Sequence, residues 1–182
     1  MKTVVFAFGR FQPPTIGHRI LINAVKHIAK TNNAYYAIYA SRTHDHKINP
    51  LEIDVKMRFL SKMFPDTNLI AANDQVRTFI EAAKDLNKKF DNLIMVAGSD
   101  RVDSYTTLLN KYNGIEFNYN TIKVVSAGER DPDSDNASGM SGTKMREAAR
   151  TNNLVLFKTG VVGLEDSDAQ QIMQYIQGLV VK

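Results

Sequence analysis

The segment TVVFAFGRFQPPTIGH, residues 3–18, decides the fold. Its first six residues are β-prone and apolar with no polar alternation, which is typical of a strand buried on both faces of a parallel sheet. Glycine directly after such a strand lets backbone N–H groups approach a ligand, and a helix that begins at the end of the segment adds a partial positive charge. The segment therefore predicts a strand, a loop suited to phosphate and a helix, in that order.

The same alternation continues along the chain. We expect further strands over 35–40, 68–72, 93–97 and 121–126, and helices over 20–28, 51–63, 76–86, 102–109, 143–150 and 168–176. Asn49 is expected to cap the helix at 51–63, with Pro50 in its first position. Residues 127–140 are polar and rich in Asp, Ser and Gly, which indicates a loop that is either a lid or disordered.

This order of elements predicts an α/β protein, a single-domain Rossmann-like parallel sheet with helices on both faces. The sequence contains no internal repeat or linker, so we expect one domain over 1–182, with a core over about 3–150 and a C-terminal helical segment over about 151–182. In such sheets ligands bind beyond the carboxyl ends of the strands. Chemistry is therefore expected at those strand ends.

Composition excludes several classes of protein. The 182 residues are 43% hydrophobic and 23% charged, which is close to the globular average. Cysteine is absent, which excludes a disulfide scaffold, a cysteine nucleophile and thiolate metal sites. No apolar run is long enough to span a membrane, and no signal-peptide pattern opens the sequence, so we expect a cytoplasmic protein.

The net charge of +4 fits nucleic acid, nucleotides or other phosphates about equally well. No run of five basic residues occurs, and aromatic residues are not interleaved with basic ones, so nucleic acid is the less favoured partner. The alternating His44, Asp45 and His46 are interpreted as a polar loop rather than as metal ligands.

Two segments carry candidate chemistry. In the first, residues 9–18, Arg10 offers a fork of hydrogen-bond donors to a phosphate, and His18 offers a ring N–H. The simpler alternative is a tight turn between strand and helix that is capped by Thr15. The second is GMSGTKMR at 139–146, where Ser141 and Thr143 are both N-cap candidates for a helix. Its lysine and arginine lie near the start of that helix, where the helix dipole disfavours positive charge, and this suggests an anion partner. The alternative is an ordinary capped helix at the surface.

Together the two segments resemble nucleotidyltransferases of the class I aminoacyl-tRNA synthetase superfamily. Residues 15–18, TIGH, are similar to its His-x-Gly-His motif, with Thr15 in place of the first histidine, and GRFQP at 9–13 is most like the archaeal type of nicotinamide mononucleotide adenylyltransferase. Residues 140–146 resemble the Ile-Ser-Gly/Ser-Thr-x-x-Arg motif of the same enzymes, with Met140 in place of isoleucine. Asn49-Pro50-Leu51 with Lys56 resembles a further family segment beside the nucleotide site.

The resemblance implies which residues form the site. The predicted catalytic residues are His18, Arg146, Thr15 and Arg10. The predicted residues for substrate and ATP binding are Gly9, Phe11, Gln12, Gly17, Asn49, Gly98, Asp100, Ser141, Gly142 and Thr143. For two of these residues a structural role is an equal alternative to substrate binding. The Gln12 side-chain amide could satisfy backbone groups of a loop, and Asp100 could cap the next helix. Tryptophan is absent, so Tyr105 and Phe11 are candidates for the ring contacts that relatives make to nicotinamide.

The implied reaction is the transfer of AMP from ATP to nicotinamide mononucleotide, which forms NAD and pyrophosphate. Mg²⁺ would be bound through the ATP phosphates, without a metal site made by protein ligands. The alternatives are adenylyl or cytidylyl transfer to another phosphate acceptor, such as phosphopantetheine or a sugar or polyol phosphate, and a non-catalytic descendant that binds nucleic acid or protein. The sequence is also compatible with a homo-oligomer.

Overall fold

The computed structural model describes residues 1–128 and 140–180. Its elements follow in the order β1 (Thr3–Gly9), α1 (His18–Thr31), β2 (Tyr35–Ala40), α2 (Ile53–Met63), β3 (Leu69–Ala71), α3 (Phe79–Leu86), β4 (Asn92–Ala97), η1 (Ser99–Arg101), α4 (Val102–Tyr112), β5 (Thr121–Ser126), α5 (Gly142–Arg150), α6 (Leu154–Thr159) and α7 (Asp166–Gln177). The five strands pair in parallel in the order β3-β2-β1-β4-β5. The predicted α/β class with a parallel sheet is confirmed.

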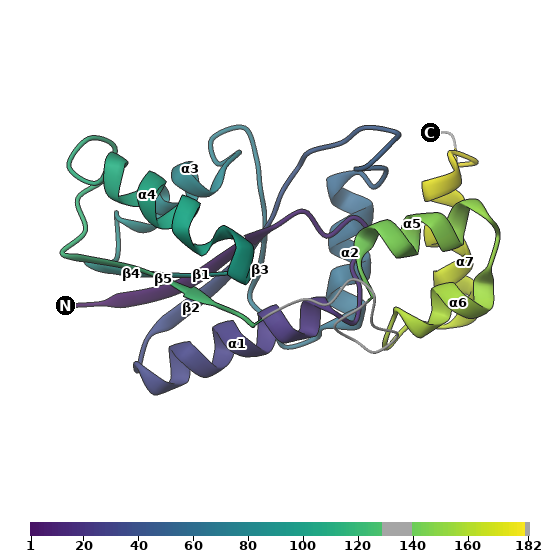
Figure 1. Cartoon of the computed structure of the whole chain (residues 1–182), viewed down its shortest axis with the longest axis horizontal. Coiled ribbons are helices and arrows are strands. Elements are labelled where there is room, and N and C mark those ends of the chain that lie inside the picture. Colours follow the sequence, from purple (N-terminus) through teal and green to yellow (C-terminus); the bar gives the residue numbers. More distant parts are fainter. Residues whose placement is uncertain (129–139, 181–182) are drawn as a thin grey trace.

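β1 lies at the centre of the sheet, and its apolar run serves two cores at once. Val4 and Phe6 point to the face covered by α3 and α4, while Val5 and Ala7 point to the face covered by α1 and α2. All four side chains are almost fully buried. In Figure 1 α3 and α4 lie above the sheet and α1 lies below it. This is why the strand shows no polar alternation in the sequence.

A third core lies beyond the sheet and joins α2 to the C-terminal helices. Leu51, Val55 and Phe59 pack there with residues of α5, α6 and α7, such as Phe157 and Ile172. On its other face α2 packs against the sheet through residues such as Leu60. Burial of each large side chain contributes about 1.5–3 kcal/mol. Because α2 is buried on both sides, it fixes where α5 lies relative to the strands (Figure 1).

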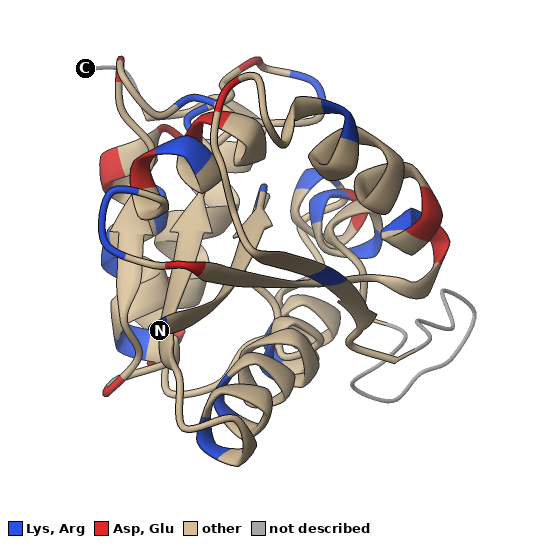
Figure 2. Ribbon diagram, turned by 90° about the vertical axis from the view of Figure 1, so that its left-hand side faces the viewer, with Lys and Arg blue, Asp and Glu red and all other residues tan. Residues whose placement is uncertain are grey.

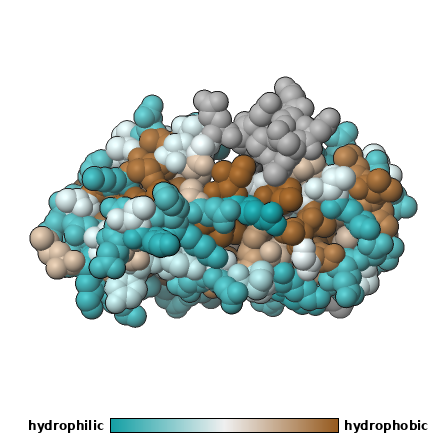
Figure 3. Space-filling model, turned by 90° about the horizontal axis from the view of Figure 1, so that it is seen from below, coloured by the Kyte–Doolittle hydropathy of each residue, from teal (hydrophilic) through white to brown (hydrophobic). Residues whose placement is uncertain are grey.

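The face of the molecule on the side of α1 is mostly polar. Seen from the side of α1, hydrophilic residues dominate, with hydrophobic patches in the middle and toward the end formed by α5–α7 (Figure 3). In Figure 2 α1, the lowest helix of the view, carries bands of basic residues and no acidic ones. No helix in the described part of the chain is both long and apolar enough to cross a membrane.

Several expected element boundaries are wrong. Asn49 does not cap α2: its side-chain amide donates to the carboxylate of Asp45, and the helix begins at Ile53 after Glu52. α1 is capped by Gly17 rather than by Thr15. In residues 140–180 the structure has three helices, where two were expected, because α6 is too short and too exposed to leave an amphipathic pattern. Most of the loop predicted over 127–140 lies outside the described residues.

The turn after β1 depends on a close contact between two neighbouring positions. Phe11 adopts a left-handed backbone conformation with φ of +51°, which is uncommon for a residue with a side chain. Its ring folds back over Gly9, where a Cβ atom would lie 2.7 Å from the nearest ring carbon. Glycine is therefore required at the end of β1 by the ring, and not by its own dihedral angles.

We predict that Gly9→Ala lowers the free energy of unfolding by about 1–3 kcal/mol, because the added methyl group overpacks the Phe11 ring. In the background of Phe11→Leu the same change should have a smaller effect, since a shorter side chain leaves more room. Urea denaturation of the wild type, both single variants and the double variant measures this coupling. Strictly additive effects would show that the two positions do not interact.

Candidate active site

A cleft of about 620 Å³ opens at the carboxyl ends of β1, β4 and β5. Its walls come from five segments: the end of β1 with the loop that follows it, the first turn of α1, the loop after β4 together with Tyr105 of α4, residues 127–128 and the first turn of α5. This is the edge of a parallel sheet at which ligands bind. Both sequence motifs contribute to one cavity, although about 120 residues separate them.

The two motifs touch through Arg146. Its Nη1 donates a hydrogen bond of 2.7 Å to the backbone carbonyl of Gln12, in the loop after β1. Its Nη2 donates to the hydroxyl of Thr143 at 3.2 Å, one turn earlier on α5. The guanidinium is therefore held on both sides and lines the cleft in a fixed orientation.

Gly142 allows this close approach. A Cβ atom on Gly142 would lie 2.9 Å from the carbonyl oxygen of Gln12 and 3.1 Å from Nη1 of Arg146. Such contacts are too short for any side chain, so glycine is needed where α5 begins. Figure 1 shows the loop after β1 running to the start of α5. The GMSGTKMR segment thus supplies the Arg146 guanidinium and, at Gly142, the space into which this group fits.

His18 is oriented by the turn that precedes it. The backbone N–H of Thr15 donates to Nδ1 of His18 at 2.9 Å, and the Thr15 hydroxyl lies 3.2 Å from the same nitrogen. The Phe11 ring packs against the imidazole with a centroid separation of 4.6 Å. Because Nδ1 accepts the backbone N–H, a neutral imidazole carries its proton on Nε2. The ring therefore has an N–H donor on the side away from Thr15.

The two helix starts differ in the backbone donors that they offer. At α1 the N–H groups of His18, Arg19 and Ile20 donate to the carbonyls of residues 15–17, so the expected set of free donors is absent there. At α5 the Ser141 hydroxyl accepts from the backbone of Lys144, which confirms Ser141 as the cap. No described residue accepts from the N–H groups of Gly142 or Thr143. The start of α5 is thus the better anion site.

Positive charge is concentrated around the contact between the motifs. Burial lowers the pKa of Arg146, and the charges of Arg150 and Arg10 lower it further, while Asp45 acts in the opposite direction. The carboxylate of Asp45 already accepts hydrogen bonds from the backbone of the loop that contains it. The guanidinium groups therefore repel one another with little compensation, and an anion bound in the cleft would relieve that repulsion.

The remaining predicted residues divide into two groups. Gly9, Arg10, Phe11, Gly17, Gly98 and Asp100 line the cleft together with His18, Arg146 and residues 141–143. Gln12 also borders it, but its side-chain amide is used by the loops, because it donates to the carbonyls of Thr43 and Leu51 and accepts from the N–H of Leu51. Thr15 is buried behind His18, and Asn49 is buried and does not line the cleft.

Sequence reasoning missed part of the cleft wall. Ile20 and Leu21 line it from the first turns of α1, and Arg101 lines it from η1. Ile20 is exposed in the structure, whereas its sequence spacing only indicated the apolar face of a helix. Tyr105 lines the cleft and packs on Phe79 with ring centroids 4.5 Å apart, whereas Phe11 is buried beneath His18. Both ring-contact candidates line the cleft, and Tyr105 is the more exposed of the two.

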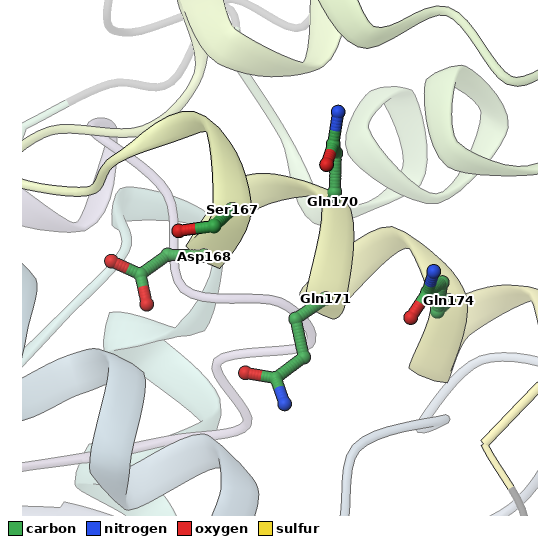
Figure 4. Close-up of a pocket in the computed structure, with 5 residues that line it drawn as sticks. All are labelled: Ser167, Asp168, Gln170, Gln171 and Gln174. Atoms are coloured by element: carbon green, nitrogen blue, oxygen red, sulfur yellow. The ribbon is translucent and has the colours of Figure 1, made fainter.

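A second hollow, shown in Figure 4, lies along α7 and lacks the features of an active site. Ser167, Gln170 and Gln174 line it together with two side chains that are already paired: Asp168 bonds to Lys62, and Gln171 accepts from Arg58. It is wide open and lies on a single helix. Among the described residues no group of three or more histidine and acidic side chains could hold a metal ion.

The sheet order and the cationic cleft at its carboxyl edge together define a nucleotide-binding α/β protein. The chain belongs to the cytidylyltransferase-like family, whose model matches residues 6–148. Membership of this family indicates that the protein is a nucleotidyltransferase. A search of curated proteins found no relative.

Solved structures with the same fold include nicotinic acid mononucleotide adenylyltransferase of Plasmodium falciparum, once complexed with NaAD and once with APC. Each is 12% identical to this chain with a TM-score of 0.62, and the similarity covers 99% of this chain and 100% of that one. At this level of identity the likeness shows the fold alone.

Lys56 of α2 lies directly behind the cleft and is fully buried. Burial lowers the pKa of its ammonium group from 10.5 to about 8, and the positive charge of Arg10 contributes to the shift. Sequence analysis associated this residue with the nucleotide site only through the segment at 49–51. Its burial could not be foreseen, because lysine is almost never fully buried.

We predict that the stability of the protein rises with pH above 8 because of Lys56. Between the folded pKa of about 8 and the unfolded value of 10.5, only the unfolded chain holds this proton. The free energy of unfolding of the wild type should therefore increase relative to that of Lys56→Met, by at most about 1.4 kcal/mol per pH unit. Below pH 8 both states hold the proton and the difference should be constant. Urea denaturation at pH 7, 8, 9 and 10 tests this, and parallel pH profiles would contradict it.

Proposed function

We propose that the protein transfers AMP from ATP to nicotinamide mononucleotide, with release of pyrophosphate. The observation that carries this proposal is the hydrogen bond between Arg146 and the Gln12 carbonyl, which places both motifs on one cleft. The resemblance of GRFQP at 9–13 to the archaeal type of adenylyltransferase supports the choice of acceptor. The similar fold of an enzyme named for nicotinic acid mononucleotide is in keeping with an acceptor of this kind.

The chemistry requires no nucleophile from the protein. A phosphate oxygen of the acceptor, already anionic at neutral pH, attacks the α-phosphorus of ATP in line. A new phosphorus–oxygen bond forms as the bond from the α-phosphorus to the bridging oxygen breaks, and pyrophosphate leaves with the electron pair. Catalysis then consists of positioning and of stabilising negative charge on the group in transfer.

The residues of the cleft suit these tasks. Arg146, Arg10 and the N–H groups at the start of α5 would hold the triphosphate. His18 would donate its Nε2–H to a phosphate oxygen, with Thr15 holding the ring in the required tautomer. Asp100 is the only carboxylate among the described residues that line the cleft, so Mg²⁺ would enter with ATP and be held mainly by phosphate oxygens and water.

The acceptor would lie toward the opposite end of the cleft. Tyr105 offers an aromatic surface, and Asp100 is exposed beside Arg101, with 3.7 Å between their charged groups. An aromatic ring and a loosely held ion pair suit a substrate that combines a flat ring with a ribose phosphate. Cytidylyl transfer is the second candidate function, because the family is described as cytidylyltransferase-like.

A panel of substrates tests the proposed function. We expect pyrophosphate release with ATP, Mg²⁺ and nicotinamide mononucleotide, and little release when CTP replaces ATP. Nicotinic acid mononucleotide, phosphopantetheine, and sugar and polyol phosphates complete the acceptor panel, and the adenylylated product is identified by mass spectrometry. Turnover only with CTP, or only with an acceptor that is not a pyridine nucleotide, would replace the proposed reaction. No turnover with any pair would remove it.

We predict that His18→Ala lowers kcat by about 10²–10³-fold, the effect of losing one donor to the transition state. The matched control is His27→Ala, since His27 lies on the same helix but is exposed to solvent and should be replaceable without loss. Steady-state kinetics measure the effect, and circular dichroism checks that both variants are folded. Near-normal turnover of His18→Ala would exclude the histidine from the mechanism.

A further inference from the structure

The ammonium group of Lys56 connects two backbone segments at the base of the cleft. Its Nζ donates to the carbonyl oxygen of Arg10 at 2.7 Å and also to the carbonyl oxygen of Ser41. Arg10 opens the loop after β1, and Ser41 follows directly after β2. The side chain is fully buried, and in the described part of the chain no carboxylate forms an ion pair with it.

These two carbonyls mark the point at which β1 and β2 separate. The parallel ladder pairs Gly9 with Ala40, and one more bond runs from the Ser41 N–H to the Gly9 carbonyl. Beyond it the two chains form no further ladder bond, and no described backbone N–H donates to their next carbonyls, those of Arg10 and Ser41. Lys56 supplies donors to both carbonyls from α2. The Lys56 side chain thus makes the hydrogen bonds to these carbonyls that the strand ladder no longer makes where the sheet ends.

The contact with Arg10 also determines a backbone donor of the cleft. A trans peptide unit is planar, so its carbonyl and its N–H point in opposite directions. When Lys56 holds the Arg10 carbonyl toward α2, the N–H of Phe11 is directed away from α2. No described residue accepts from that N–H, and both Arg10 and Phe11 line the cleft. The position of the ammonium group therefore determines the direction of the Phe11 N–H. It also determines the position of the Arg10 backbone from which the arginine side chain extends.

An ammonium group is a costly way to satisfy two carbonyls. Burial without a counter-ion disfavours the charge, in agreement with the lowered pKa of this lysine. The charge of Lys56 therefore adds little to the stability of the fold. The binding of a phosphate in the cleft, in contrast, would be strengthened by a correctly placed loop and by a nearby cation.

We propose that Lys56 is a positioning residue for the phosphate groups bound in the cleft: by holding the carbonyls of Arg10 and Ser41, it keeps the loop after β1 in the conformation that presents its donors. This rests on the proposed function, in which the cleft binds a nucleoside triphosphate. Lys56 does not line the cleft, so it acts through the loop and not by contact with substrate.

The test compares Lys56→Met, Lys56→Gln and Lys56→Arg with the wild type. Lys62→Met is the matched control, because Lys62 lies on the same helix but is half exposed and pairs with Asp168. Calorimetry measures the affinity for inorganic tripolyphosphate, and steady-state kinetics with the best substrate pair measure KM for the nucleotide and for the acceptor. Circular dichroism and urea denaturation establish which variants are folded.

We expect the neutral variants to fold, to bind tripolyphosphate about 10²-fold more weakly and to show a raised KM for the nucleotide with an unchanged KM for the acceptor. Lys56→Arg should recover much of the affinity, because it keeps a charged donor, and Lys62→Met should match the wild type. A general structural defect would instead lower kcat without changing one KM selectively.

A folded neutral variant that binds tripolyphosphate within about twofold of the wild type would overturn the proposal. Failure of both neutral variants to fold would also overturn it, because Lys56 would then be required for folding and not for phosphate binding. The wild-type assays decide the proposed function separately. If the wild type binds tripolyphosphate but transfers no nucleotidyl group, the proposed function fails while the positioning role is still decided by the affinities of the variants.

Discussion

The guanidinium of Arg146 donates to the carbonyl of Gln12 at 2.7 Å, and the geometry of the cleft depends on this contact. It joins the loop after the central strand to the start of α5, two segments that the chain separates by more than a hundred residues. The approach is possible only because position 142 has no side chain. A cation, a glycine and a helix start therefore meet at one point, and none of the three would suit an anion as well alone.

The support for that contact comes from α2. One face of this helix packs on the sheet, and the other packs on the cluster formed with α5, α6 and α7. The position of α5 is thus transmitted to the strands through apolar packing, which is dense and resists displacement. The buried ammonium of Lys56 belongs to the same helix, so α2 supports two of the segments that line the cleft: α5 through packing and the loop after β1 through hydrogen bonds.

Local signals in the sequence were sufficient for the strands and for the two motifs. The apolar run from Thr3 indicated a central parallel strand because it had to bury both faces, and Ser141 indicated the start of α5 because its hydroxyl caps the helix. Prediction failed where a side chain had a partner distant in sequence or an unusual local one. Asn49 bonds to Asp45 instead of capping α2. For Gln12 the sequence left open whether the amide binds substrate or satisfies a loop, and the structure shows it bonded to carbonyls 31 and 39 residues away. No local pattern reports such pairings.

Because Tyr105 lines the cleft, a fluorophore introduced at this position would report on the cleft. The chain contains no tryptophan, so its intrinsic fluorescence comes from tyrosine alone. A Tyr105→Trp protein would carry one indole, in the cleft and against the ring of Phe79. Its emission would report the polarity of that wall without background from elsewhere in the molecule. Occupancy of the cleft could then be followed in solution in real time, with ligands that have no chromophore of their own.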